Sequence, residues 1–128
     1  MLNRSGVSKT TYAAPKQILA NVELQSSVGC IVPQSIGVTV GAHKIVKAGT
    51  PIKIDLNNLQ TPAQAATGSV ALNAVLLHDV DVTAGNANGT ALIFGFVNVN
   101  RVESDVATLI TTASAASGRS QLITFIKA

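Results

Sequence analysis

Residues 74–99 hold the pattern that decides the fold, AVLLHDVDVTAGNANGTALIFGFVNV. The beginning of this stretch belongs to residues 70–82, an apolar run typical of a buried strand that continues as strict alternation of polar and apolar side chains. Residues 83–90 combine Gly, Asn and Thr, the composition of a turn that reverses a hairpin. Residues 91–99 provide the returning strand, in which Gly95 between two Phe residues indicates a bulge or a close approach of another backbone. The stretch therefore predicts an antiparallel hairpin.

The sequence before this hairpin also predicts strands joined by turns. In residues 52–56 the apolar side chains alternate with Lys53 and Asp55, which is the pattern of a half-buried strand. Ala-Gly-Thr-Pro at residues 48–51 predicts a turn, because Gly supplies unusual backbone angles and Pro fixes its own. Shorter candidate strands lie at residues 31–32, 36–40, 44–46 and 122–126.

Residues 100–118 change to a helical period. Asn100 is placed to cap a helix, Glu103 follows three residues later as in a capping box, and Gly118 is a natural stop. The apolar side chains at helical spacing are Val102, Val106, Leu109, Ile110 and Ala113. We therefore expect a helix near residues 101–117 and a fold that is mainly β with one or two helices.

The chain divides into an N-terminal arm and a single domain. Residues 1–28 are polar and lack sustained periodicity, so we expect an extended arm that orders only against another surface, with one short ordered piece near residues 18–24. Residues 29–128 carry the strand and helix patterns and predict one β-rich domain.

Composition narrows the classes of function. Only 12% of the 128 residues are charged, about half of the ~25% usual for soluble domains, so we expect part of the surface to be covered by a partner or by further copies. The chain has no Trp and one Tyr, which disfavours binding by stacking of bases or sugars. Its net charge of +3 is too mild for a nucleic-acid footprint. The apolar runs are far shorter than a membrane span, and no signal-peptide pattern follows Met1.

The excess positive charge lies near the N-terminus. Arg4, Lys9 and Lys16 all precede the first acidic residue, Glu23. This distribution fits a basic arm that contacts an acidic surface, and it equally fits an ordinary solvated tail.

Catalytic and metal-binding patterns are weak. No nucleophile elbow, zinc-protease motif or phosphate-binding loop is present, so we expect no enzyme, no cofactor and no small-molecule substrate. His78, Asp79 and Asp81 form the densest ionisable cluster, which has two interpretations: a solvated strand end, or two carboxylates on one face holding Ca²⁺ or Mg²⁺. Nothing in the spacing of His43 and His78 supports a shared metal. Cys30, the single cysteine, excludes an internal disulfide and is expected in the core.

Two segments carry recognisable motifs. The first is KAGTPI at residues 47–52, and the second is AVLLHDVDVTAG at residues 74–85 followed by NGTALIFGFVN at residues 88–98. As an ordered set over roughly residues 44–115, they resemble the head decoration proteins of tailed bacteriophages. The resemblance implies a compact β-tulip or β-barrel-like fold, made in the bacterial host cytoplasm and carried on the outer surface of the virion.

The same resemblance implies a role and partners. Lambda-type decoration proteins assemble as trimers over three-fold positions of the capsid, clamp the major capsid protein and order an N-terminal arm on it. By position and character, Arg4, Lys9, Tyr12 and Lys16 are the residues that we expect to contact the capsid, without nucleic acid or membrane as a partner.

Three alternatives remain beside the decoration role. One is the capsid-bound base of a head fibre or host-adhesion element, and another is a tail or connector component. The third is a small β-barrel hydrolase or sugar-binding domain, for which the chain lacks a nucleophile–base pair and an aromatic platform.

Overall fold

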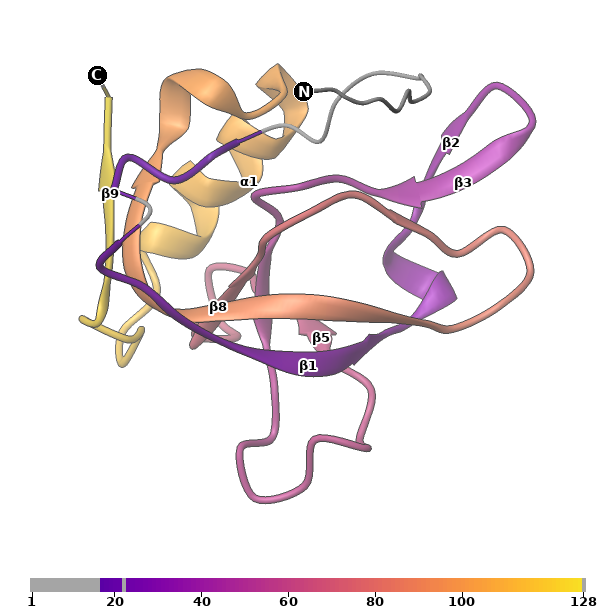
Figure 1. Cartoon of the computed structure of the whole chain (residues 1–128), viewed down its shortest axis with the longest axis horizontal. Coiled ribbons are helices and arrows are strands. Elements are labelled where there is room, and N and C mark those ends of the chain that lie inside the picture. Colours follow the sequence, from indigo (N-terminus) through magenta and orange to yellow (C-terminus); the bar gives the residue numbers. More distant parts are fainter. Residues whose placement is uncertain (1–16, 22, 128) are drawn as a thin grey trace, which may run out of the picture.

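The computed structural model describes residues 17–21 and 23–127, and β-strands dominate it. The predicted fold class is confirmed: the described part is mainly β, with one α-helix and two 3₁₀ turns. The strands form two sheets, and the helix packs beside the larger one (Figure 1).

The larger sheet is built around one long strand, β8. Its strand order is β1 (Ser26–Val32), β8 (Ala87–Asn98), β6 (Ala74–Leu76), β4 (Pro51–Lys53) and β5 (Gln64–Ala65), and β9 (Ile123–Ile126) also pairs with β8. All these pairs are antiparallel except β8–β9, which is parallel. The parallel pair follows from the connection, because α1 lies between the two strands and crosses over the sheet.

The predicted hairpin is present only in part. β6 and β8 pair antiparallel, with Val75 opposite Leu92. The expected strand of residues 70–82 is broken, however, because β7 (Val80–Asp81) belongs to the second sheet. At the break, the Asp79 carboxylate accepts a hydrogen bond of 2.7 Å from the backbone N–H of Ala48, two residues after β3.

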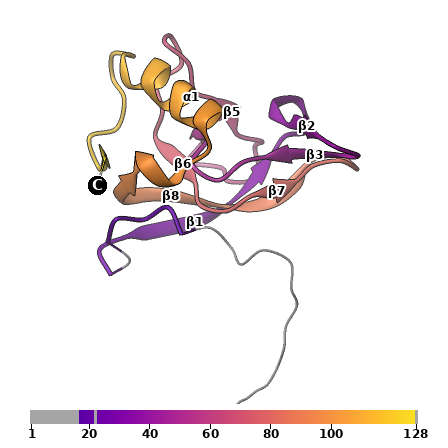
Figure 2. The same ribbon diagram turned by 90° about the horizontal axis from the view of Figure 1, so that it is seen from above.

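The second sheet is small and lies at one end of the molecule. Its order is β2 (Val38–Val40), β3 (His43–Val46) and β7, and a 3₁₀ turn, η1 (Gln34–Ile36), precedes it. The β2–β3 hairpin projects from the end opposite β9 (Figures 1 and 2). The strand expected at residues 36–40 therefore begins two residues late, at Val38.

The turn predicted at residues 48–51 is confirmed. Gly49 has φ of 93°, and the Thr50 hydroxyl donates a 2.6 Å hydrogen bond to the Lys47 carbonyl. A Cβ atom added to Gly49 would lie 2.5 Å from Cγ1 of Val102, so the turn packs directly under the segment that leads into the helix. Glycine is required here both for its backbone angle and for its lack of a side chain.

The helix is shorter than the period predicted. A 3₁₀ turn, η2 (Val99–Arg101), comes first, and α1 spans Ser104–Ser114 with Glu103 at its N-cap position. The expected cap at Asn100 is therefore wrong: its N–H instead bonds to the Asn98 side chain, which caps the 3₁₀ turn. Gly118 has φ of 82° but lies beyond the helix, which ends in a run that mixes Ala with Ser and Thr, whose helical preference is weak.

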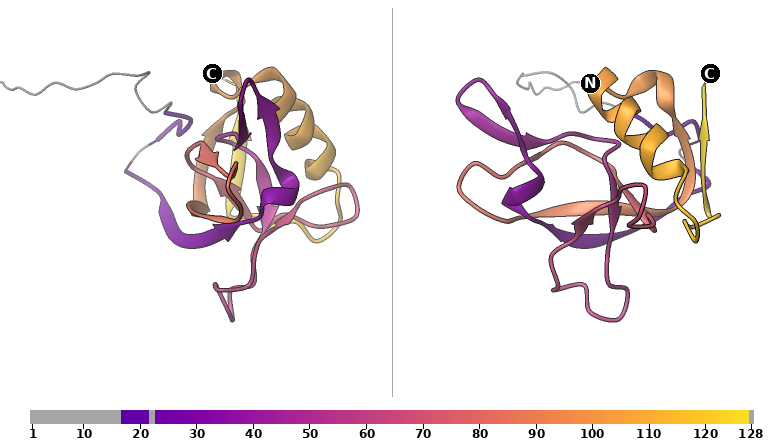
Figure 3. Two further views of the ribbon diagram at one scale, coloured as in Figure 1. Left: turned by 90° about the vertical axis from the view of Figure 1, so that its right-hand side faces the viewer. Right: turned by 180° about the vertical axis from the view of Figure 1, so that it is seen from behind.

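One face of α1 covers the larger sheet (Figure 3). Val106, Ile110 and Ala113 are buried, as the helical spacing predicted, whereas Leu109 is 43% exposed. The helical spacing therefore predicted the apolar face of α1 correctly except at Leu109, which is exposed.

The core begins earlier in the chain than expected. Ile18 is fully buried and Leu19 forms an isolated bridge with Val97, so residues 18–20 lie along β8 ahead of β1. The boundary expected near residue 28 falls inside β1, which starts at Ser26. Apolar burial explains the shift, because Ile18 and Leu19 join the core cluster around Leu92.

The two outer strands of the larger sheet approach each other at one point. The N–H of Ala63, just before β5, donates a 2.9 Å hydrogen bond to the Ile31 carbonyl on β1. This bond draws the ends of the sheet together, while the full tulip or barrel closure stays a prediction.

Candidate interaction surfaces

The arm residues expected to contact a capsid lie outside the described residues. Arg4, Lys9, Tyr12 and Lys16 all precede Gln17, where the described part begins. Their role therefore stays a prediction.

The fold separates the ionisable residues that are adjacent at positions 78–81 of the sequence. Asp79 accepts its hydrogen bond from Ala48, whereas Asp81 lies on β7 and pairs with Nδ1 of His43 at 3.2 Å. Hydrogen bonds from Thr83 hold the pKa of Asp81 below its usual value, with a smaller effect from His43. Within residues 17–21 and 23–127, no group of three His, Cys, Asp or Glu side chains is arranged to hold a metal ion.

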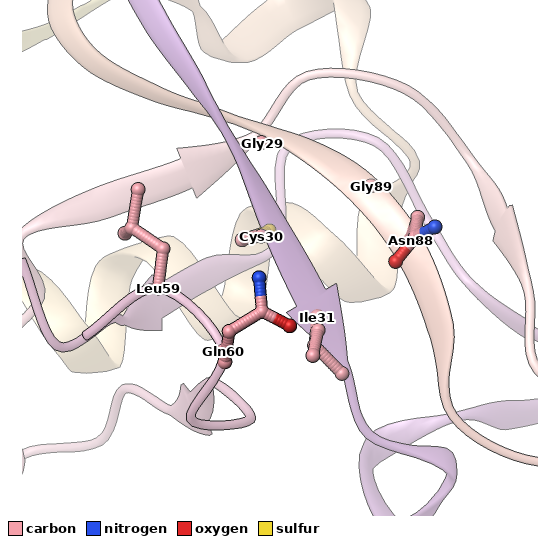
Figure 4. A pocket seen from close by; sticks show the side chains of 7 residues that line it. All are labelled: Gly29, Cys30, Ile31, Leu59, Gln60, Asn88 and Gly89. Atoms are coloured by element: carbon pink, nitrogen blue, oxygen red, sulfur yellow. The ribbon is translucent and has the colours of Figure 1, made fainter.

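A hollow of about 480 Å³ lies against β1. Gly29, Cys30 and Ile31 line one side, and Leu59 and Gln60 approach from the loop that precedes β5 (Figure 4). Cys30 lies in the core as predicted, 6% exposed, and burial raises the pKa of its thiol. No charged side chain and no histidine lines the hollow, so no general base stands beside the thiol of Cys30.

The projecting second sheet exposes apolar side chains on its outer face. Val38 and Val40 are 44% and 47% exposed, and Ile45 lies opposite Val38 on the same face. On the other face Val46 is 1% exposed and Lys44 is half-buried, whereas Thr39 is exposed. A groove of about 310 Å³ runs from Val40 and Ile45 toward the N-terminus of α1.

Acidic side chains surround this groove. Asp79 and Glu103 line it, Asp81 lies opposite Ile45 on β7, and Asp105 lies in the first turn of α1. Lys47 also lines the groove. Its Nζ lies 3.0 Å from Oδ2 of Asp105, and this contact holds the pKa of Asp105 below its usual value. We call this region the acidic surface; it consists of Val38, Val40, Ile45, Lys47, Asp79, Asp81, Glu103 and Asp105.

A second apolar region covers the β8–β9 end. Leu122 and Phe94 lie level with each other, because Gly95 pairs with Ile123 in the parallel ladder, and they are 59% and 38% exposed. Ile126 lies two pairs farther along the same face and is 37% exposed. Within the described part of the chain, β9 pairs with β8 alone, so its outer edge is open.

Of the two cations near β9, one follows this second region in the chain and the other lies on the opposite face. Lys127 follows Ile126 and is exposed. Arg119 donates a 2.8 Å hydrogen bond to the Ile123 carbonyl, and its guanidinium lies 5.3 Å from the centre of the Phe125 ring, on the face opposite Leu122 and Ile126. We call the apolar region the β9 surface; it consists of Phe94, Leu122, Ile126 and Lys127.

Sequence reasoning had missed both surfaces. The strand patterns at residues 36–40 and 122–126 predicted strands, but alternation does not say which face is left uncovered. The net charge of +3 gave no sign of the acidic surface, because basic residues elsewhere in the chain outnumber its carboxylates. The signal that was present is the low overall charge, which predicted covered surface.

Comparison with family models, with curated proteins and with solved structures finds no match to this chain. Among the described residues, no helix is long and apolar enough to cross a membrane.

Proposed function

We propose that this chain is a decoration protein of a tailed-bacteriophage head. It binds the outer surface of the capsid as a trimer at three-fold positions and stabilises the capsid lattice. The partners are the major capsid protein and further copies of the chain, and the role is structural rather than enzymatic.

The observation that carries this proposal is how the two resembling segments meet. The turn at residues 47–52 and the segment at residues 74–85 lie far apart in the chain, yet the N–H of Gly49 donates a 2.7 Å hydrogen bond to the Leu76 carbonyl. The N–H of Leu76 donates in return to the Thr50 carbonyl at 2.9 Å. Residues 88–98 then form β8, which pairs with β6. The motifs of the family resemblance thus make up one contiguous unit, as a shared fold requires.

The exposed apolar side chains support a binding role. Eight large hydrophobic side chains are exposed in the described part, and five of them belong to the acidic or the β9 surface. Concentrated exposed apolar area marks interaction sites in soluble proteins. A protein that works by being covered on several sides also accounts for a charged fraction of 12%.

Binding to capsids tests the role directly. The purified full chain is co-sedimented with expanded, undecorated heads assembled from the major capsid protein of the same genome, and copies bound per head are counted. Saturation at three copies per three-fold position, with a raised melting temperature of the heads, is the expected result. Absence of binding to heads would refute the role. Saturation at few positions with reduced adsorption to cells would favour a fibre base, and binding to tails a tail component.

Contacts of the arm are tested by charge reversal. Lys9→Glu is expected to weaken capsid binding, whereas Lys53→Glu changes the net charge equally at the exposed end of β4 and is expected to leave binding unchanged. Equal binding by both variants would remove the arm from the contact. A deletion should stop at residue 16, because removing Ile18 and Leu19 would damage the core.

A further inference from the structure

The described part of the chain begins close to the acidic surface. Nη1 of Arg101 donates a 3.5 Å hydrogen bond to the Gln17 carbonyl, so the first described residue lies against the segment that leads into α1. Glu103, two residues after Arg101, lines the groove of about 310 Å³ and directly precedes α1. Residues 1–16 are therefore attached to the body near the border of the acidic surface.

The attached segment and the acidic surface are opposite in charge. Residues 1–16 hold three of the nine basic residues of the chain and no acidic residue. The acidic surface holds four of the six acidic residues. Against these carboxylates stand Lys47, within the surface, and Arg101, at its border, so negative charge is in excess. A cationic segment is attracted to such a surface.

The acidic surface also offers an apolar contact. Val38 and Val40 are 44% and 47% exposed on β2, which ends the order of the second sheet. Tyr12 lies four residues before Lys16, so an extended arm carries its ring at most about 14 Å beyond Lys16. A ring that is apolar with a hydroxyl at its tip suits a groove with apolar walls and a polar border.

Attachment to the body strengthens a contact of this kind. For a short flexible link, the effective concentration of the attached segment is in the millimolar range. A contact too weak to hold a separate peptide is therefore still formed by residues 1–16 of the same chain.

We propose that residues 1–16 dock on the acidic surface of their own copy, with the basic side chains beside the carboxylates and Tyr12 against Val40 and Ile45. This contact does not rest on the proposed capsid function. Its consequence does: a capsid that takes up the arm has to displace it from the body, which lowers the apparent affinity for the capsid by the fraction of arms that are free.

The fluorescence of Tyr12 reports the position of the arm, because the chain has no other tyrosine and no tryptophan. Quenching by acrylamide in the full-length protein is compared with quenching in a synthetic peptide of residues 1–16, in which the ring is fully accessible. The quenching constant is expected to be at least about two-fold lower in the protein, since more than half of the arms are docked when the effective concentration exceeds the dissociation constant.

Two variants with matched controls locate the contact. Val40→Lys places a cation in the acidic surface and is expected to raise the quenching constant to that of the peptide. Leu56→Lys makes a similar change at an exposed apolar side chain in the loop after β4 and is expected to keep the wild-type value. Lys16→Glu, compared with a peptide that carries the same change, is expected to release the arm, whereas Lys53→Glu is not. Circular dichroism and thermal melting check that each variant is folded.

A mixture shows whose surface the arm occupies. Val40→Lys keeps its arm and its tyrosine but has a damaged surface, whereas Tyr12→Phe has an intact surface and no tyrosine fluorescence. After the two are unfolded and refolded together, Tyr12 of the first variant is expected to stay as accessible as in the peptide. Recovered protection would mean that the arm docks on another copy, which contradicts the proposal.

The remaining outcomes also overturn it. Equal quenching constants in the wild type and the peptide would remove the contact altogether. Protection that survives Val40→Lys or Lys16→Glu would place the arm on another part of the body. Because no capsid is present, these results are independent of the capsid-binding test.

Discussion

Replacing Gly49 with Ala tests how the turn at residues 47–52 is held. Two costs act together in this variant. A backbone at φ of 93° is unfavourable for a residue with a Cβ atom, by roughly 1–2 kcal/mol. The new Cβ would also lie 2.5 Å from Cγ1 of Val102, and overpacking of this kind costs about 1–3 kcal/mol. We therefore expect Gly49→Ala to lower the free energy of unfolding by about 2–5 kcal/mol.

A second substitution separates the two costs. Val102→Ala removes the clashing methyl group, so it is expected to cost about 1–2 kcal/mol in the wild type and to be neutral or stabilising beside Ala at position 49. The cost of the backbone angle remains in the double variant. Gly68→Ala is the matched control, because a Cβ there meets no atom within 4 Å, and it is expected to change stability by less than about 0.5 kcal/mol.

Urea unfolding followed by circular dichroism measures the free energy of unfolding of all five proteins: the wild type, the three single variants and the double variant. If Gly49→Ala lowers the free energy of unfolding by less than about 1 kcal/mol, neither cost acts as described, since either one alone reaches that value. If Val102→Ala lowers the free energy of unfolding equally in the wild type and in Gly49→Ala, the clash between the new Cβ and Val102 is absent.

Three further predictions concern single polar groups. Asn73→Ala is expected to lower the free energy of unfolding by about 1–3 kcal/mol in urea titrations, because its side chain bonds both the N–H and the carbonyl of Ile54 at 2.8 Å; an unchanged midpoint would contradict it. The pKa of Asp105 is lowered in the folded state, chiefly by its hydrogen bond with Lys47, so its stabilisation is present above the unfolded pKa and is lost as pH falls through the folded one. Melting temperatures of Asp105→Asn should therefore fall less steeply than those of the wild type below about pH 4, and parallel curves would refute this. Cys30 is buried with a raised thiol pKa, so Ellman's reagent is expected to label it in urea and not in the native protein, and rapid native labelling would count against its burial.

The alternation of apolar and polar residues predicted the strands that have one buried face and one face exposed to solvent. Ile52 and Ile54 are 1% and 4% exposed, as the alternation required. Leu56 continues the same alternation but is 57% exposed, because the chain has left the sheet by then. The hydrophobic period alone does not predict where the chain leaves the sheet, since that point depends on where the partner strand ends.

Pairing partners were the part that local reasoning lacked. Val80 and Asp81 alternate as a strand should, but they pair with β3 rather than continuing along β8. The N–H of Ala48 also donates a hydrogen bond to the Asp79 side chain, and such long-range contacts have no signature in a sequence window. The sequence did not predict β5 for a different reason. Its two residues, Gln64 and Ala65, are too few to show any period.

The candidate surfaces depended on the same missing information. The exposed Val38 and Leu122 sit in strands that the sequence predicted, and their residue type gave no sign that nothing packs over them. Only the assembled sheets show which apolar side chains remain uncovered. The residues at positions 78–81 likewise form no single cluster, because Asp79 bonds to the N–H of Ala48 whereas Asp81 pairs with His43.

The parallel pairing of β8 with β9 has a consequence for the order of events during folding. The ladder joins Gly95 to Ile123, and α1 lies between the two strands. The entropy of closing such a connection must be lost before the contacts across it are gained, so this ladder forms more slowly than one joined by a short turn. Until α1 has crossed over the sheet, the edge of β8 toward β9 stays open and can pair with another chain.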